Sequence, residues 1–355
     1  MTYLDYQATT PLAPEARQAM LRWLAEDGFA NPHSAHAMGR AAKAAVEVAR
    51  EQVAALFPPG GKVIFTGSAT EAINLAIQGR AYGKIAVSAI EHAAVRDTAR
   101  AVGQDHELPV APDGLVDPEV ALPDGVGLVA VMQVNNEIGT IQPVTRLAER
   151  AHQAGALFLC DAVQGAGKLA APTGADLIAV SAHKLHGPKG IGALWIRDGV
   201  ELLPLIHGGG QESGLRSGTL SPALCAGFGA AVQVALARQE EDAAHVSSLW
   251  DAARDELLRW TLNGSETKRW KGNLNLRLNG LDVARLMSEC RRVMFSAGSA
   301  CASGSGRPSH VLRALGLSDS EARSSIRLGF GRYTTREELI EACRAIDAAA
   351  KAQGV

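Results

Sequence analysis

The sequence has no long uninterrupted apolar segment. None of the apolar runs in its 355 residues reaches the roughly 18 residues that a helix needs to cross a bilayer. The first residues, Met1 to Asp5, contain neither the basic region nor the apolar core of an export signal. The sequence therefore predicts a cytoplasmic protein with no membrane partner.

Cysteine and excess positive charge are also scarce. The chain has five cysteines, an odd number, and no CxxC pair, which argues against a disulfide framework and against a zinc site. The net charge is −2, and the lysines and arginines are spread along the chain. No metal is expected and nucleic acid is not a favoured partner, whereas small anionic ligands fit this composition.

A regular alternation of two patterns fills most of the chain. From about residue 40 to residue 240, short apolar runs alternate with alanine-rich helical stretches. This alternation is typical of βαβ units and predicts an α/β fold with a mostly parallel sheet covered by helices. The clearest strands are 63–65, 85–87, 128–131, 157–159, 177–180 and 192–196, and the clearest helices are 37–56 and 143–154.

The pattern changes toward the C-terminus. Residues 222–260 predict one or two long helices, and we place a domain boundary near residue 240. Beyond it, weaker strands and a final helix predict a smaller α+β domain. The strands are expected at 273–278, 293–295 and 326–330, and the helix at 336–350.

One lysine stands between an apolar run and a glycine-rich loop. Lys184 follows the predicted strand 177–180 and lies within the segment 181–193. It can be an ordinary solvated loop charge. Alternatively, small neighbours and apolar strands on both sides draw it toward the interior, where desolvation makes an amine a nucleophile for carbonyl carbon. The second interpretation predicts a lysine that forms a Schiff base.

A helix start follows the first predicted strand. Residues Gly67 to Glu71 come directly after the apolar strand, which extends here to Thr66, and open a predicted helix at 72–77. The unpaired amides of such a helix start, together with the Ser68 and Thr70 hydroxyls, can bind an anion. A plain N-cap is the alternative, since serine and threonine are favoured there without any ligand. The P-loop pattern is absent, so a nucleoside triphosphate is a poor fit.

Polar residues follow three further predicted strands at their carboxyl ends. Asp161 ends one apolar run, with Gln164 one turn later, Asn136 follows a second run, and His92 follows a third. Open α/β sheets bind ligands at this edge, where Asp161 could hold a pyridine nitrogen protonated. His92 could stack on a flat cofactor or move a proton. Each residue also has a structural alternative, as a helix cap, a turn residue or a satisfied polar group.

Two segments rich in small residues complete the candidate set. Residues 207–219, which end at Thr219, are either a flexible connection or a loop whose backbone approaches a phosphate closely. Residues 296–306 hold Cys301 among small residues, which suits an accessible nucleophile on a mobile segment. The remaining cysteines have apolar or helical contexts and are interpreted as buried hydrophobic residues. They are Cys160, Cys225, Cys290 and Cys343.

Taken together, these residues resemble the cysteine desulfurases, which belong to the class V aminotransferase branch of the fold-type I pyridoxal phosphate enzymes. The resemblance covers nearly the whole chain, and the order and spacing of the motifs make it specific. Further motifs that carry it are LDYQATTP at 4–11, NPHS at 31–34, SSIR at 324–327 and GRYTT at 331–335. The Ser-Ala-Gly-Ser-Ala-Cys motif that ends at Cys301 is similar to the group with the longer catalytic-cysteine loop.

The resemblance implies a role for each candidate residue. Lys184 would bind pyridoxal 5'-phosphate as a Schiff base, His92 would stack on the ring as a catalytic residue, and Cys301 would form a persulfide. Asp161 would pair with the pyridine nitrogen and Gln164 with the ring hydroxyl. The phosphate would be held by Ala69, Thr70, Ser181 and His183, with Thr219 from the neighbouring subunit of a homodimer. The carboxylate of the substrate would be held by Asn136 and Arg327.

The resemblance also implies a reaction and a domain layout. L-cysteine would be converted to L-alanine, and the sulfur would pass from the Cys301 persulfide to an acceptor protein. Residues 15–240 would form the large cofactor-binding domain, and residues 1–14 and 241–355 the small domain that carries the catalytic cysteine. The family's phosphate loop often reads Ser-Gly-Ala-Thr rather than Gly-Ser-Ala-Thr, and Ala182 stands where glycine is common.

The sulfur acceptor and three rival functions are left open. The chain stops at Val355 without the extended tail that house-keeping members use to dock an iron–sulfur scaffold, so tRNA thiolation or another pathway is an equal expectation. A selenocysteine lyase or a class V aminotransferase would share the cofactor and the lysine, although an aminotransferase has no use for Cys301. A catalytically inactive binding scaffold is the non-enzymatic alternative, and the intact set of candidate residues argues against it.

Overall fold

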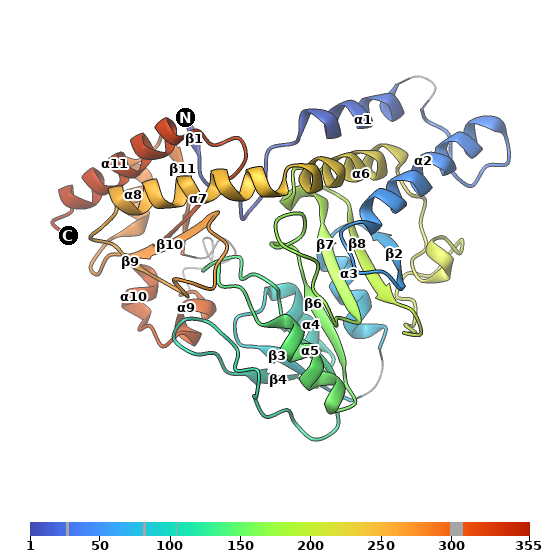
Figure 1. The fold of residues 1–355 in the computed structure, drawn as a ribbon, viewed down its shortest axis with the longest axis horizontal. Helices are drawn as coiled ribbons and strands as arrows, with labels where there is room; N and C mark the ends of the chain where they lie inside the picture. The colour runs from blue at the N-terminus through green and yellow to red at the C-terminus, as the bar shows by residue number, and fades with distance from the viewer. Residues whose placement is uncertain (26–27, 81–82, 104, 299–307) are drawn as a thin grey trace.

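The chain folds into two main sheets with helices packed around them (Figure 1). The computed structural model describes residues 1–25, 28–80, 83–103, 105–298 and 308–355. Within these ranges, no helix has the length and apolar character that crossing a membrane requires. Both termini lie at the end of the molecule formed by helices α8 (Val283–Glu289) and α11 (Arg336–Ala352) (Figure 1).

The larger sheet has seven strands and is mostly parallel, as the alternation predicted. In the described part of this sheet, only β8 runs antiparallel to its neighbours, because a short connection rather than a crossover helix joins it to β7. All six predicted strands are present. In spatial order the strands are β2 (Gly61–Thr66), β8 (Gly192–Arg197), β7 (Leu177–Ser181), β6 (Leu157–Asp161), β5 (Val126–Ala130), β3 (Lys84–Ser88) and β4 (Asp105–Leu108).

Helices cover both faces of this sheet, so successive strand residues enter two different cores. In β2, Ile64 packs on the side of α3, whereas Val63 and Phe65 pack on the opposite side. Burial on both faces explains why the strands are continuous apolar runs. One face is covered by α3 (Ala69–Gln78) and α4 (Ala93–Ala101), and the other by α1 (Pro14–Leu24), α2 (Ala37–Ala54), α5 (Val144–Gln153) and α6 (Pro222–Ala237).

A smaller antiparallel sheet forms the second part of the protein. Its strands, in spatial order, are β12 (Ser296–Ala297), β13 (Ser325–Gly329), β10 (Asn273–Arg277) and β9 (Thr261–Leu262). It shares a core with α7 (Gln239–Glu256), α8 and α11. The remaining short elements are the parallel pair β1 (Thr2–Tyr3) and β11 (Val293–Met294), helices α9 (His310–Ala314) and α10 (Asp319–Arg323), and the 3-10 turns η1 (Ala182–Lys184) and η2 (Glu212–Gly214).

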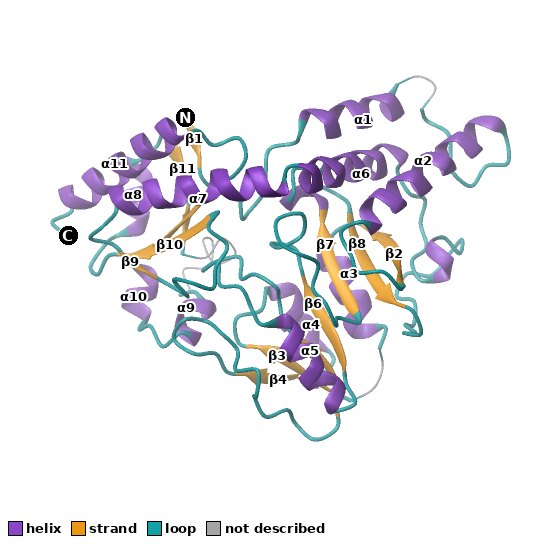
Figure 2. Cartoon of the chain, viewed as in Figure 1, coloured by secondary structure: helices purple, strands orange, loops and turns teal. Residues whose placement is uncertain are grey.

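We propose that the chain divides near residue 240 into a large domain of residues 15–240 and a small domain of residues 1–14 and 241–355. Helix α6 buries Phe228 in the core of the large sheet, whereas α7 buries Leu249 in the core of the small sheet. The two helices run end to end and meet at Arg238, as Figure 2 shows. Leu4 packs in the second core, which supports assigning the N-terminal segment to the small domain.

Candidate active site

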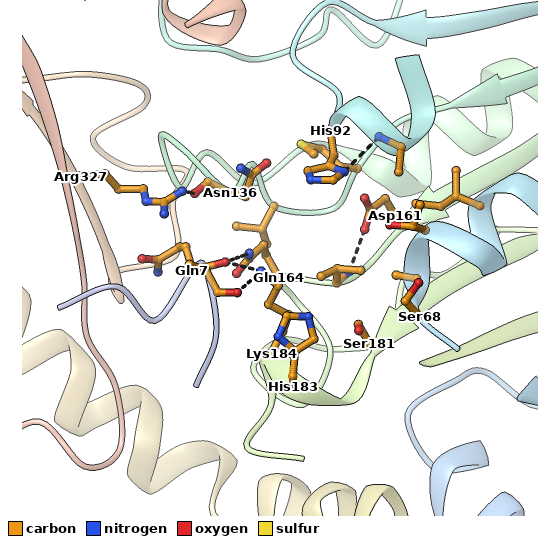
Figure 3. Close-up of a pocket in the computed structure, with 18 residues that line it drawn as sticks. Gln7, Ser68, His92, Asn136, Asp161, Gln164, Ser181, His183, Lys184 and Arg327 are labelled. Carbon is orange, nitrogen blue, oxygen red and sulfur yellow. Dashed lines mark hydrogen bonds between the residues drawn. The ribbon is translucent and has the colours of Figure 1, made fainter. Parts of the chain in front are cut away.

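A cavity of about 320 Å³ opens at the carboxyl ends of the parallel strands (Figure 3). Asp161 is the last residue of β6 and Ser181 the last of β7, while His92 and Asn136 follow β3 and β5. Because these strands are parallel, their carboxyl ends meet at one edge of the sheet. The sequence-predicted residues that line the cavity are Ala69, Thr70, His92, Asn136, Asp161, Gln164, Ser181, His183, Lys184 and Arg327.

Two predicted residues are not part of this lining. Thr219 is exposed at the end of the glycine-rich loop and does not line the cavity of its own chain. Cys301 lies outside the residues that the structure describes. The other four cysteines are free and buried, as expected, and burial raises the pKa of each thiol, for Cys225 and Cys343 to about 12. These four side chains are therefore protonated thiols near neutral pH.

The amine of Lys184 is held by the N-terminal segment of the chain. Lys184 ends the 3-10 turn η1 directly after β7, and its Nζ donates to the backbone oxygens of Gln7 at 2.5 Å and Ala8 at 2.8 Å. Gln164 Nε2 donates to the same Gln7 oxygen at 3.0 Å. The lysine is therefore not a solvated loop charge, because it points into the cavity and is fixed there by two carbonyl groups.

Asp161 and Gln164 offer acceptors to a ligand in the cavity. Burial raises the pKa of Asp161, while His92 and Lys184 act in the opposite direction, so a cation beside this carboxylate would stabilise its charged form. Its Oδ1 accepts from the Val163 amide at 3.0 Å. The Oε1 atom of Gln164 is buried and has no hydrogen-bond partner among the described residues. A protonated ring nitrogen and a hydroxyl group fit these two acceptors.

His92 begins helix α4 and faces the cavity (Figure 3). Its Nδ1 accepts a hydrogen bond from the Ala94 amide at 3.1 Å, so the neutral ring carries its proton on Nε2. This hydrogen bond restricts rotation of the His92 imidazole ring. The arrangement suits a ring that covers a flat ligand and donates from Nε2.

The start of helix α3 provides an anion site at the other end of the cavity. Ser68 caps this ten-residue helix by accepting from the Glu71 amide, and helix geometry leaves the first amides without partners inside the helix. Burial lowers the pKa of His183 to about 4, so its imidazole ring is neutral near pH 7. The Nδ1 atom of this ring lies 3.2 Å from Thr9 Oγ1. A neutral histidine can bind a phosphate only by donating a hydrogen bond.

Arg327 enters the cavity from the small sheet. Its side chain is 1% exposed, and it donates to Asp5 Oδ1 at 2.7 Å and to the backbone oxygen of Asn136 at 3.1 Å. Figure 3 shows Arg327 and Asn136 on the side of the cavity away from Ser68. An anion held at the start of α3 and a carboxylate held by Arg327 would therefore occupy opposite ends of the same cavity.

Several residues in the cavity or next to it carried no assigned role in the sequence. Gln7 and Ala8 belong to the LDYQATTP motif, but no local pattern connects them to Lys184. Glu91 and Glu137 are buried beside His92 and Asn136, and burial raises their pKa values to about 8 and about 7. Their positions next to predicted site residues are the signal that could have identified them.

A family model, curated relatives and solved structures all match this chain over nearly its whole length. The family model described as Aminotransferase class-V matches residues 2–341. "Cysteine desulfurase IscS" of Rickettsia bellii is 42% identical over 368 residues, covering 97% of this chain and 90% of that protein. The solved structure of a "NifS-like protein" superposes with a TM-score of 0.90 at 31% identity and covers 98% of both chains. "SspA in complex with cysteine" has a TM-score of 0.82 at 34% identity, over 94% of this chain and 100% of that one.

Proposed function

Because the chain belongs to the class-V aminotransferase family, we infer that it is a pyridoxal phosphate-dependent cysteine desulfurase. The observation that carries this function is the 42% identity to a cysteine desulfurase over 97% of the chain. The cavity supports it, because Lys184, Asp161 and Arg327 line it together. The enzyme converts L-cysteine to L-alanine and passes the sulfur on.

Pyridoxal 5'-phosphate fits the donors and acceptors of the cavity. We propose that Lys184 binds it covalently, that Asp161 pairs with its ring nitrogen, that Gln164 Oε1 meets its hydroxyl and that His92 covers the ring. Its phosphate would be bound by Ala69, Thr70, Ser181 and His183. When bound, the cofactor supplies an electron sink for the electron pair released at the substrate Cα.

Arg327 and Asn136 would hold the carboxylate of L-cysteine. An arginine suits this role because its planar fork can donate two parallel hydrogen bonds to a carboxylate. Both side chains line the cavity at the end opposite the α3 helix start. The substrate would therefore be oriented with its carboxylate toward the small domain.

We propose that the free amine of Lys184 would take the Cα proton at its Nζ atom. Gln7 and Ala8 then act as acceptors that keep the freed amine within the cavity, because both carbonyls already lie within hydrogen-bonding distance of Nζ. His92 can assist this proton movement through Nε2, the nitrogen that its cap to Ala94 leaves protonated. Both groups belong to the described lining of the cavity.

Cys301 is proposed to attack the substrate sulfur as a thiolate. A sulfur–sulfur bond forms to Cys301 Sγ while the carbon–sulfur bond breaks, and the carbon keeps the electron pair and takes up a proton to give alanine. Cys301 is left as a persulfide. This assignment rests on the sequence motif that ends at Cys301 and on the burial of the other four thiols.

A homodimer would complete the phosphate site through Thr219 of the second copy. The loop that carries Thr219 is fixed to its own chain, since Arg50 donates to Glu212 at 2.7 Å and Arg216 donates to Glu71 at 2.7 Å. Near this loop, Leu203, Leu205 and Ile206 have exposed fractions of 60%, 37% and 40%. Such an apolar surface beside an ordered loop supports contact with a second copy.

The persulfide requires an acceptor protein, for which iron–sulfur cluster assembly and tRNA thiolation are the proposed pathways. A cytoplasmic location is proposed as well, and the four described free thiols are consistent with a reducing compartment.

The test is mass spectrometry of the holoenzyme after incubation with L-cysteine, combined with quantification of alanine. The expected result is one added sulfur atom on Cys301 and alanine formation that Cys301→Ala abolishes. Cys290→Ala is the matched control, because this buried thiol lies outside the cavity, and its rate should equal that of the parent. Unchanged alanine formation by Cys301→Ala would refute the nucleophile. Rates on L-selenocysteine, compared with L-cysteine, separate the desulfurase from a selenocysteine lyase.

A further inference from the structure

The guanidinium of Arg327 is held by three groups from distant parts of the chain. Nη2 donates to Asp5 Oδ1 at 2.7 Å and to Ser296 Oγ at 3.4 Å, and Nη1 donates to the Asn136 backbone oxygen at 3.1 Å. The side chain is buried, so it depends on these partners for the hydrogen bonds that water would otherwise provide. Three of the five N–H donors of the arginine are used in this way, and two remain for a ligand.

Asp5 has a fixed position relative to the backbone that carries Arg327. The Gly329 amide donates to the Leu4 oxygen at 2.8 Å, and the Tyr6 amide donates to the Gly329 oxygen at 3.3 Å. These bonds lock the residues on both sides of Asp5 to strand β13, two positions beyond Arg327. The Asp5 carboxylate is therefore attached to the strand on which Arg327 stands.

Two neighbouring hydroxyl groups reinforce this position. Ser296 Oγ donates to Asp5 Oδ1 at 2.9 Å, so one carboxylate oxygen accepts from both Ser296 and Arg327. The Tyr3 hydroxyl donates to the Asp5 backbone oxygen at 3.1 Å, and burial raises the pKa of Tyr3 to about 12, so this donor persists at any working pH. Asp5 is thus oriented by groups that do not themselves line the cavity.

We infer that Asp5 is a positioning residue, which orients the guanidinium of Arg327 so that its remaining donors face the substrate carboxylate. The inference rests on the proposed role of Arg327 in binding the substrate. Without Asp5, the guanidinium fork of Arg327 can turn toward other acceptors. Hydrogen bonding of a carboxylate by the remaining donors depends on that orientation.

The test is steady-state kinetics of the holoenzyme with L-cysteine, in which alanine is quantified. Asp5→Ala should raise KM roughly tenfold, the effect of one hydrogen bond to a charged group, and leave kcat within about twofold of the parent. Asp5→Asn keeps an acceptor but not the charge, so its KM should rise by a smaller factor. This partial rescue is not expected of a general loss of stability.

Asp347→Asn is the matched control. Asp347 accepts from Arg259 at 2.6 Å in the same small domain and does not line the cavity, so its replacement should leave KM unchanged. Arg327→Ala reports on the proposed function itself, because it must raise KM if this arginine binds the substrate.

The outcomes distinguish the proposed role of Arg327 in substrate binding from the inferred role of Asp5 in positioning Arg327. An unchanged KM in Arg327→Ala refutes the proposed substrate site, and the role of Asp5 with it. A raised KM in Arg327→Ala combined with parent-like KM values in both Asp5 variants overturns the role of Asp5 alone, as does a fall in kcat without a change in KM. If Asp5→Ala does not fold, Asp5→Asn decides, since a parent-like KM in that variant also overturns the inference.

Discussion

The guanidinium of Arg216 donates to the carboxylate of Glu71 at 2.7 Å and 3.3 Å. Glu71 stands in the first turn of α3, where it also accepts from the Gly67 amide at 2.7 Å, and Arg216 lies three residues before Thr219. The ion pair therefore fixes the loop that carries Thr219 against the helix start that would bind the phosphate of the same chain.

Arg216→Ala should weaken pyridoxal phosphate binding. Both side chains are about three-quarters or more buried, so the pair resists screening by salt, and its loss should raise the dissociation constant of the cofactor roughly threefold to tenfold. Absorbance of the cofactor after equilibrium dialysis measures this constant. Arg344→Ala, which breaks an exposed ion pair with Glu256, should leave it unchanged. If Arg216→Ala and Arg344→Ala bind the cofactor with equal affinity, the Arg216–Glu71 ion pair does not support cofactor binding.

Gly192→Ala should disturb the same helix start by steric contact. A Cβ atom at this position would lie 2.6 Å from the Val180 oxygen and 2.7 Å from the Ser68 carbonyl carbon, both of them backbone atoms. Relief requires α3 to move away from β8, at a cost of about 1–3 kcal/mol in the free energy of unfolding. Thermal unfolding and cofactor affinity should both decrease, and a variant that matches the parent in both would show that the helix start tolerates displacement.

Lys184→Ala should reduce alanine formation from L-cysteine by a factor of at least roughly 10²–10⁴, the usual contribution of a general base alone. The reason is that this amine is proposed both to bind the cofactor and to take the Cα proton. Lys189→Ala is the control, because Lys189 is an exposed lysine of the same loop and should give the parent rate. A Lys184→Ala enzyme with residual activity close to the parent would exclude the proposed base.

Glu91→Gln should change how stability depends on pH. Burial raises the pKa of Glu91 from 4.5 to about 8, so between these values the folded protein binds a proton that the unfolded chain has lost. The contribution of this bound proton to the free energy of unfolding is complete below pH 4.5, and it disappears as the pH rises through 8. Glutamine mimics the protonated carboxyl at every pH.

The melting temperature of Glu91→Gln minus that of the parent should therefore be a few degrees larger at pH 8 than at pH 5.5. Differential scanning calorimetry at these two values measures the difference. Glu256→Gln, at a carboxylate that pairs with Arg344, serves as the control and should show no such trend. A constant difference between Glu91→Gln and the parent would mean that Glu91 is charged throughout this range.

The residues at strand ends could be predicted because their position follows from local pattern and sheet geometry. Asp161, Ser181 and His92 each follow an apolar run, and parallel strands bring such ends together wherever the helices lie. The strand β4 was missed because its side chains are mostly exposed and polar, so no apolar run marks it. Helices α6 and α7 were expected as one or two helices, and the change of backbone at Arg238 decides for two.

The contributions of Asp5 and Gln7 could not be predicted from local pattern. Asp5 meets Arg327 across 322 positions of sequence, and Gln7 meets Lys184 across 177. Neither periodicity nor propensity carries information over such separations. The raised pKa of Glu91 was equally out of reach, because it depends on complete burial beneath parts of the chain that only the folded structure brings together.

The pairing of the N-terminus with the end of the chain sets the order in which the enzyme can be assembled during synthesis. Strand β1 pairs with β11 at Val293 and Met294, and Asp5 forms a bridge with Gly329. The segment 2–5 must therefore wait until residues 293–329 have been synthesised before it finds its partners. Since residues 5–8 hold both Lys184 and Arg327, the proposed large domain can fold early, whereas the cavity is complete only after residues 293–329 have been translated.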